Sequence, residues 1–364
     1  MKTEKKRLAG IDLLKTVAIL LVLFYHSRMV LETNLCYDAS LRMKIYYIMM
    51  SLTGACVPIF FLASGYLMLS RPLDMGRHMR RTLHYLLLTL FWGALTILGR
   101  MVKNGETFSI VGLLRELYYL PSGTPSHLWF MGTLIIIYIL FPLIHAAWEN
   151  CRSGLYFFTA VLFVMTFGNT ALNMCVNVYD YFIRTGVNPD AGINFFGQYN
   201  PFTGFHAYAL VYFILGGLFR EQQERILKVL RLPVSILLIV GAGLLSGLYG
   251  IFMTRSMGSY WDSVSGFYDS LFTLAATIGW AGLCLRYGGK GRAAGILKWV
   301  GSSTLGLYFV HFILRAPAIS LFRRLGLSNY YFVSTIGFFI MLTILSSALV
   351  YVGKKIPGLR KLLE

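Results

Sequence analysis

Charged residues are scarce in this sequence of 364 residues, and acidic residues are the scarcest of them. Asp, Glu, Lys and Arg make up 13% of the chain and hydrophobic residues 57%, whereas a soluble domain carries about 25% and roughly 45–50%, respectively. This shortage of charge excludes an ordinary soluble protein. Apolar stretches of about 20 residues recur along the chain and leave no room for a soluble domain of roughly 100 residues. We therefore expect a single membrane domain over residues 1–364.

The sequence also lacks the cysteine patterns that hold metal ions. Its five cysteines form no Cys-x-x-Cys pair and no spacing with histidine that is typical of a metal site. Cys36 and Cys175 fall in predicted outer loops where a disulfide could form, but two scattered cysteines are weak evidence for one. Internal repeats and Pro-rich linkers are absent as well. We predict no bound metal.

Basic residues outnumber acidic ones, with 33 Lys and Arg against 15 Asp and Glu and a net charge of +18. The apolar runs predict an all-α fold of about ten transmembrane helices, over residues 10–32, 47–70, 83–101, 127–148, 154–173, 206–219, 232–252, 264–285, 299–319 and 331–353. Both termini then lie on one side, and the loops on that side carry most of the Lys and Arg. The positive-inside rule places this side in the cytoplasm. Because topology and contact with membrane lipids account for the charge, we expect no nucleic-acid partner.

Within the first predicted helix, the segment from Asp12 to His26 carries Asp12, Lys15 and His26 in an otherwise apolar run. Ionisable groups in hydrocarbon are costly and usually mark a functional site. In a helix, residues 11 apart differ by about 20° around the axis and ~16 Å along it, so Lys15 and His26 share one face, with Asp12 within about 40° of it. The pattern indicates a polar path across the membrane. His26 taken alone is compatible with a core histidine, a metal ligand, a proton relay or a general base.

The inner loop and helix start at residues 71–84 hold the densest set of potential phosphate-binding side chains. Members of this set lie three or four residues apart, so a helix would align most of them. The set is Arg77, Arg80, Arg81 and His84. The planar guanidinium group of arginine suits phosphate. The alternative is an ordinary positive-inside loop that binds lipid headgroups.

Further polar side chains begin or interrupt the later spans. His311 lies at mid-depth of the ninth span, one turn after Tyr308, and a second buried imidazole favours an interior polar cavity. His127 and Trp129 begin the fourth span, where Trp129 is most simply an interfacial anchor. Ser64 and the glycine after it are small residues that suit close helix packing.

Together these segments resemble the acyltransferase 3 family of bacterial integral-membrane acyltransferases. The strongest part is the first helix, because the family's basic residue, ten intervening residues and histidine correspond to Lys15 and His26. Three shorter segments resemble family patterns of the second, fourth and late helices, in the same order. They are Phe60 to Leu67, His127 to Phe130 and Leu307 to His311.

The resemblance also extends to the third helix, where the family has an Arg-x-x-Arg pair that is expected to bind the acyl donor. That spacing fits Arg77 with Arg80, whereas another register pairs Arg81 with His84. The register that binds the donor therefore stays open.

What the resemblance implies is transfer of an acyl group, usually acetyl from cytoplasmic acetyl-CoA, to a hydroxyl of a cell-envelope glycan or glycolipid. The enzyme would be a multi-pass protein of the bacterial cytoplasmic (inner) membrane. The family's catalytic role falls on His26, as general base or as acetyl carrier, with Lys15 as its basic partner and Asp12 paired to Lys15. On the acceptor side we expect His311, Tyr308, Trp129 and His127.

A membrane transporter or exporter of a small polar molecule is the alternative, because buried ionisable groups also serve binding and proton coupling. Matching broken helices in the two halves would favour it. The sequence offers only the glycines near residues 204–217 as such a sign. Oligomeric state, acyl chain and acceptor are not predicted by the sequence.

Overall fold

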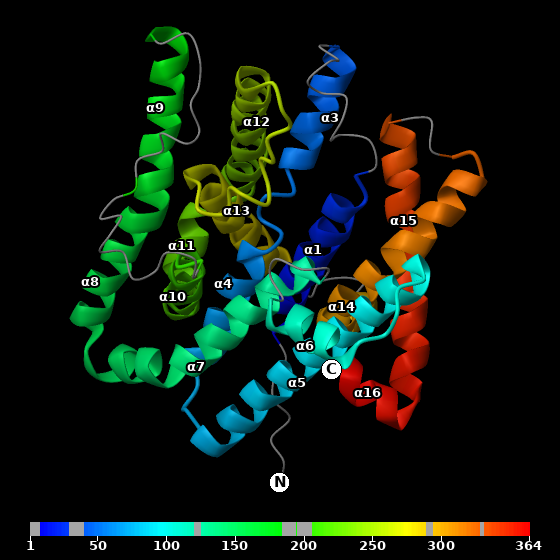
Figure 1. The fold of residues 1–364 in the computed structure, drawn as a ribbon. Helices are drawn as coiled ribbons and strands as arrows, with labels where there is room; N and C mark the ends of the chain where they lie inside the picture. The colour runs from blue at the N-terminus through cyan, green and yellow to red at the C-terminus, as the bar shows by residue number, and fades with distance from the viewer. Residues whose placement is uncertain are drawn as a thin grey trace.

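The computed structural model describes residues 8–28, 40–119, 125–183, 194, 206–288, 294–327 and 331–364, and Figure 1 shows its helices. Throughout these ranges the regular secondary structure is helical, and no strand occurs in them. The elements are α1 (Ala9–His26), α3 (Leu41–Ser51), α4 (Pro58–Met68), α5 (Met75–Asn104), α6 (Ile110–Tyr118), η1 (Ser126–Leu128), α7 (Trp129–Asn150), α8 (Arg152–Phe163), η2 (Val164–Gly168), α9 (Asn169–Ile183), α10 (Tyr208–Glu221), α11 (Gln223–Val229), α12 (Leu232–Met257), α13 (Leu271–Tyr287), α14 (Ala294–Arg324), α15 (Tyr331–Lys355) and α16 (Pro357–Leu363).

Seven helical segments of the described chain are long and apolar enough to cross a membrane. They are α1, α5, η1 with α7, the continuous run from α8 to α9, α12, α14 and α15. Two shorter apolar helices, α4 and α13, lie among them. The predicted all-α, multi-pass membrane fold is therefore confirmed. The number of ten spans and the cytoplasmic position of the termini stay predictions.

The helices of the structure differ from several predicted spans, and three of these differences have a clear local cause. The span at 47–70 is divided between α3 and α4, because turns at residues 52–57 precede Pro58, which begins α4. The span at 154–173 continues to Ile183 through a π-helical turn at Val164–Gly168, so the helix is longer than its most apolar part. The span at 264–285 begins only at Leu271, since the polar segment before it forms turns and the Ser270 hydroxyl caps the helix.

The core of the bundle is built around α1, which packs along α14 and also contacts α4, α13 and α15 (Figure 1). The closest crossing joins α4 to α10. A Cβ atom added at Gly65 would lie 1.7 Å from the Phe213 carbonyl oxygen, and one added at Gly216 would lie 2.0 Å from the Leu62 carbonyl oxygen. Only glycine permits this approach of the two backbones. The crossing fixes α4, which carries Ser64, beside the centre of the bundle.

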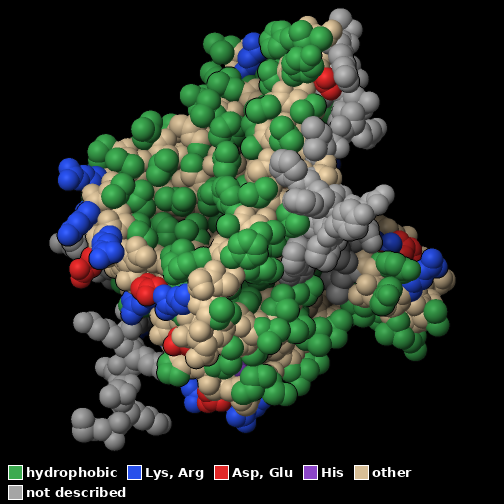
Figure 2. All heavy atoms as spheres, turned by 90° about the vertical axis from the view of Figure 1, so that its left-hand side faces the viewer, with side chains coloured by type: hydrophobic (Ala, Val, Ile, Leu, Met, Phe, Trp, Pro, Cys, Tyr) green, Lys and Arg blue, Asp and Glu red, His purple; other side chains and the backbone are tan. Residues whose placement is uncertain are grey.

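A broad apolar surface covers the face of the molecule that Figure 2 turns toward the viewer, with charged side chains gathered at its margins. The run from α8 to α9 belongs to this side (Figure 1) and exposes large apolar side chains such as Phe157 and Phe182. Exposed apolar side chains on a helix of this length suit contact with lipid tails. The interior of the protein, in contrast, holds polar cavities.

Candidate active site

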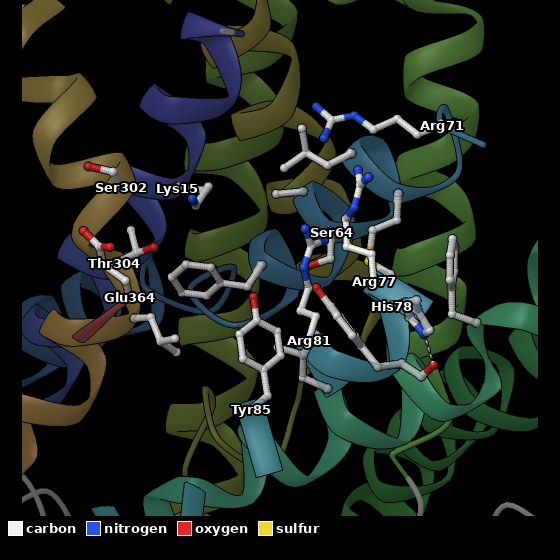
Figure 3. Close-up of a pocket in the computed structure, with 18 of the residues that line it drawn as sticks. Lys15, Ser64, Arg71, Arg77, His78, Arg81, Tyr85, Ser302, Thr304 and Glu364 are labelled. Carbon is white, nitrogen blue, oxygen red and sulfur yellow. Dashed lines mark hydrogen bonds between the residues drawn. The ribbon is translucent and has the colours of Figure 1, made fainter. Parts of the chain in front are cut away.

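A cavity of about 450 Å³ lies between α1, α4, α5, α7 and α14. Figure 3 shows polar side chains on two sides of it, with Lys15, Ser302 and Thr304 on one side and Arg71 and Arg77 on the other. Aromatic side chains of α4, α5 and α7 line the space between them, namely Phe60, Tyr85, Phe130, Tyr138 and Phe141. A cavity of this size, apolar in the middle and polar at its ends, suits an elongated ligand with a charged end.

Three arginines form the basic side of the cavity, which we refer to as the basic cavity. Arg77 and Arg81 lie one turn apart on α5, and Arg71 comes from the segment before this helix. Arg80 and His84 are not among the lining residues. Only two of the four residues predicted to bind phosphate therefore line the cavity. These two, Arg77 and Arg81, are four residues apart, whereas the Arg-x-x-Arg pattern has a spacing of three.

The start of α5 is fixed by Asp74, whose carboxylate accepts a hydrogen bond of 3.0 Å from the Arg77 backbone N–H. The same carboxylate lies 3.1 Å from the Arg77 guanidinium. This backbone hydrogen bond and the nearby cations Arg77 and Arg80 lower the pKa of the Asp74 carboxyl from its usual value. Asp74 stays ionised at neutral pH, and as an N-cap it orients the first turn, which carries Arg77.

His78 also lines the cavity, and no sequence motif pointed to it. It is buried, and its Nε2 lies 2.7 Å from the Tyr138 carbonyl oxygen (dashed in Figure 3). Four residues after Tyr138, α7 contains Pro142, which has no N–H to donate to that carbonyl. The imidazole N–H of His78 replaces the missing donor. Pro142 inside a predicted span was the signal that a neighbouring helix must supply one.

On the opposite side, Lys15 is half-buried and reaches the cavity from α1. Asp12 is buried but does not line it, because α14 approaches α1 closely at this point. A Cβ atom added at Gly301 of α14 would lie 2.9 Å from the Asp12 carboxylate oxygen Oδ1. Glu364, which follows α16, completes this side of the cavity. Sequence motifs gave no sign that a residue so distant in the chain would lie there.

Three histidines from three helical segments come together at the end of α1. The ring centroids of His26 and His311 are 5.2 Å apart. His127 stacks on Phe312 at 3.6 Å, and Tyr308 donates a hydrogen bond from its hydroxyl to the His127 carbonyl oxygen. Tyr308 lines the cavity as well, so the cavity and the histidine cluster share a wall. We refer to His26, His127 and His311 as the histidine cluster.

Hydrogen bonding fixes the tautomer of His311. Its Nδ1 lies 3.0 Å from the Leu307 carbonyl oxygen, which can only accept, so Nδ1 carries a proton and, in the neutral imidazole, Nε2 does not. Nε2 of His311 and both ring nitrogens of His127 are buried and have no hydrogen-bond partner within the described ranges. Buried polar atoms are nearly always paired in proteins. These ring nitrogens are therefore positioned for a partner that the fold itself does not provide.

The position of His26 is held by its neighbours in the chain and by α14. Arg315 donates a hydrogen bond of 2.8 Å to the His26 carbonyl oxygen. Two residues further on, Arg28 forms an ion pair of 2.8 Å with Asp262, which also accepts a hydrogen bond of 2.6 Å from the Tyr25 hydroxyl. Burial raises the pKa of Asp262, but the Arg28 charge and these hydrogen bonds outweigh it and leave the pKa below its usual value. The end of α1 is therefore anchored on both sides of His26.

Trp129, a further predicted site residue, lies outside the basic cavity. Trp129 is half-buried, with its ring 4.7 Å from His206 and 5.6 Å from Tyr268. It follows His127 by two residues, so it lies beside the histidine cluster rather than in the basic cavity. Ser64 lines the cavity (Figure 3), while the glycine after it makes the close crossing with α10. Each small residue of this pair thus has a separate role.

The four cysteines in the described part of the chain form no disulfide. Cys151 and Cys175 are exposed, Cys56 and Cys284 are buried, and Cys36, the predicted partner of Cys175, lies outside the described residues. Within the part of the chain that the structure describes, no group of three or more His, Cys, Asp or Glu side chains is arranged to hold a metal ion.

Comparison with known proteins gives one match. The model of the family Acyl_transf_3, described as an acyltransferase domain, matches residues 8–353. The comparisons with curated proteins and with solved structures gave no match. Because the family match covers nearly the whole chain and includes both the basic cavity and the histidine cluster, this protein belongs to the acyltransferase 3 family of membrane acyltransferases.

Proposed function

We propose that this protein is a membrane O-acyltransferase that moves an acetyl group from cytoplasmic acetyl-CoA to a hydroxyl of a cell-envelope glycan or glycolipid, in the inner membrane of a bacterium. One observation carries the proposal. A single cavity begins at three arginines and ends at Tyr308, which also contacts the histidine cluster. Membership of an acyltransferase family supports the reaction class.

The donor is proposed to bind with its diphosphate at Arg71, Arg77 and Arg81 and its pantetheine arm in the aromatic middle of the cavity. Guanidinium groups bind phosphate bidentately, which favours an arginine set over lysines at this place. Lys15 and His26 are separated by ~16 Å along α1, so they cannot act on the same atom. Lys15 is therefore assigned to the donor arm, and His26 to the reacting carbonyl group.

In the reaction, the acceptor hydroxyl gives its proton to His26 while its oxygen attacks the thioester carbonyl carbon. The carbon–sulfur bond then breaks, an ester forms, and the CoA thiolate takes the proton from His26. Nε2 of a neutral His311 carries no proton, so it is suited to accept a hydrogen bond from His26 or from the acceptor hydroxyl. General-base catalysis by an imidazole raises the rate by roughly 10²–10⁴-fold.

The alternative route is an acetyl-histidine at His26, which the same arrangement permits. Here the His26 nitrogen attacks the thioester, CoA leaves as the thiol, and the acceptor hydroxyl then removes the acetyl group. The two routes differ in one observable. Only the covalent route transfers radiolabel from acetyl-CoA to the purified protein when no acceptor is present.

The test of the proposed function is transfer of labelled acetyl to an envelope glycan fraction by the purified protein in lipid nanodiscs. His26→Gln is expected to lower this transfer by roughly 10²–10⁴-fold while CoA binding and the elution volume in gel filtration are unchanged. Undiminished transfer by this variant would remove His26 from the mechanism. Uptake of a solute by CoA-free liposomes, together with no acetyl transfer, would instead support the transporter alternative.

A matched pair on α5 tests the donor site. Arg81 lines the cavity and Arg80, its neighbour in the chain, does not, yet both are exposed arginines of the same helix. Arg81→Gln is expected to raise the Kd of CoA by about tenfold or more, the scale of one charge-assisted hydrogen bond, whereas Arg80→Gln leaves it within about twofold. Equal effects of the two substitutions would contradict this donor position.

A further inference from the structure

We infer that a second cavity, which adjoins the basic cavity, binds the nucleotide end of CoA and recognises its ribose 3′-phosphate through Arg220. This inference rests on the proposed function and extends it. The cavity has a volume of about 670 Å³ and lies between the end of α4, α7, the start of α8 and the end of α10. We refer to it as the nucleotide cavity.

The two cavities adjoin each other. Arg71, Pro72 and Leu73 line both of them, and in Figure 3 Arg71 lies on the side of the first cavity away from Lys15. The backbone of this shared wall is held by His145, whose Nε2 lies 2.9 Å from the Arg71 carbonyl oxygen. CoA has the same order of parts, because its diphosphate joins the pantetheine arm to the nucleotide.

Arg152 and Arg220 both line the nucleotide cavity, but only one of them is neutralised by a carboxylate. Arg152 is neutralised by Glu221, to which its Nη1 makes contacts of 2.8 and 2.6 Å, and its guanidinium covers the Trp148 ring at 4.2 Å. Arg220 instead donates to the Tyr66 hydroxyl at 3.1 Å. This partner is neutral, so the positive charge of Arg220 remains available to an anion.

Tyr66 orients Arg220 toward the cavity. Its hydroxyl accepts from Arg220 and donates to the side-chain oxygen of Gln223, so the guanidinium is held in place without a carboxylate. Gly217 of α10 packs closely against α7, because a Cβ atom added to it would lie 2.9 Å from the Trp148 ring. The remaining carboxylate of the lining, Glu149, would repel a phosphate but suits the exocyclic amino group of adenine. The phosphate is therefore assigned to Arg220 and the base to the side of Glu149.

The experiment compares binding of CoA and of dephospho-CoA, which lacks only the 3′-phosphate, to the full-length protein in nanodiscs. For the wild-type protein, dephospho-CoA is expected to bind about tenfold or more weakly than CoA. Arg220→Gln is expected to weaken CoA binding by a similar factor and to leave dephospho-CoA binding unchanged. Arg225→Gln, an exposed arginine of α11 that lines neither cavity, makes the same change of charge and is expected to leave both constants unchanged.

Each outcome is decisive. Equal affinity of the wild-type protein for CoA and dephospho-CoA would overturn the inference and leave the proposed function intact, whereas no CoA binding at all would overturn both. An equal loss for both ligands in Arg220→Gln would assign Arg220 a structural role. Tyr66→Phe separates orientation from fold, because it should weaken CoA binding selectively while thermal stability is kept. If the effect of Arg220→Gln disappears when anionic lipids are replaced by zwitterionic ones, the cavity binds an anionic lipid headgroup and the inference fails.

Discussion

Replacing His311 by methionine is expected to stabilise the protein and at the same time to lower its activity. His311 is fully buried, its Nδ1 bonds to the Leu307 carbonyl oxygen, and its Nε2 has no partner within the described chain. That carbonyl also belongs to the hydrogen-bond ladder of α14, so it loses little in the variant. A buried unpaired polar atom costs about 1–3 kcal/mol. Methionine has a similar volume and adapts to irregular space, so we expect a gain of about 1–2 kcal/mol.

A second buried histidine provides the matched control. His78 bonds to the Tyr138 carbonyl oxygen, which Pro142 leaves without its helical donor. His78→Met would leave that buried carbonyl unpaired and is expected to cost about 1–3 kcal/mol. The same substitution should thus change stability in opposite directions at the two sites, with a difference of about 2–5 kcal/mol.

Thermal unfolding in detergent, followed by tryptophan fluorescence, measures this difference as a shift of Tm by several degrees in opposite directions. Acetyl transfer is measured on the same preparations and is expected to fall by roughly 10²-fold or more for His311→Met. A stabilised but inactive variant is typical of a site that trades stability for function. Equal losses of Tm for the two variants, or full activity of His311→Met, would refute the reasoning.

The remaining predictions concern packing, pH and the end of the chain. Gly216→Ala should abolish folding, since its Cβ would lie 2.0 Å from a carbonyl oxygen, whereas Gly132→Ala, with open space around it, should be neutral or stabilising by up to about 1 kcal/mol in a thermal scan. Asp262 has a lowered pKa, so its stabilising contribution is full above about pH 4 and is lost as the pH falls through that lowered pKa; Asp262→Asn should remove this acid-dependent part of the Tm. Trp92→Phe removes the 2.9 Å hydrogen bond to the Leu362 carbonyl oxygen and should speed tryptic cleavage within α16.

The sequence could predict the helical membrane fold because apolar runs of sufficient length have few alternatives in a bilayer. It could also predict that Lys15 and His26 share a face, since this follows from helix geometry alone. It could not predict which arginines of α5 line the cavity. That depends on which face of α5 packs against α7, and the structure turns Arg77 and Arg81 inward while Arg80 stays outside.

The same limit explains the boundaries that were wrong. Apolar composition ignores backbone hydrogen bonds, so it joined α3 to α4 across the turns before Pro58 and ended α9 too early. Glu364 was missed for another reason. It reaches the cavity because α16 folds back onto α14, where a Cβ atom at Gly306 would lie 2.9 Å from the Leu363 carbonyl oxygen. Tertiary contacts of this kind leave no periodic sign in the sequence.

The buried polar side chains of the interior differ in whether they have a hydrogen-bond partner, and no sequence motif shows this difference. Buried hydroxyls on the helices are mostly satisfied within their own helix, as Thr89 and Thr277 are by the carbonyl oxygen four residues before them. Of the eight buried side-chain atoms without a partner in the described part of the chain, three are ring nitrogens of His127 and His311. Both of these residues lie in the cluster with His26. In a membrane interior such atoms are costly, and the acceptor hydroxyl proposed above would supply the partner that they lack.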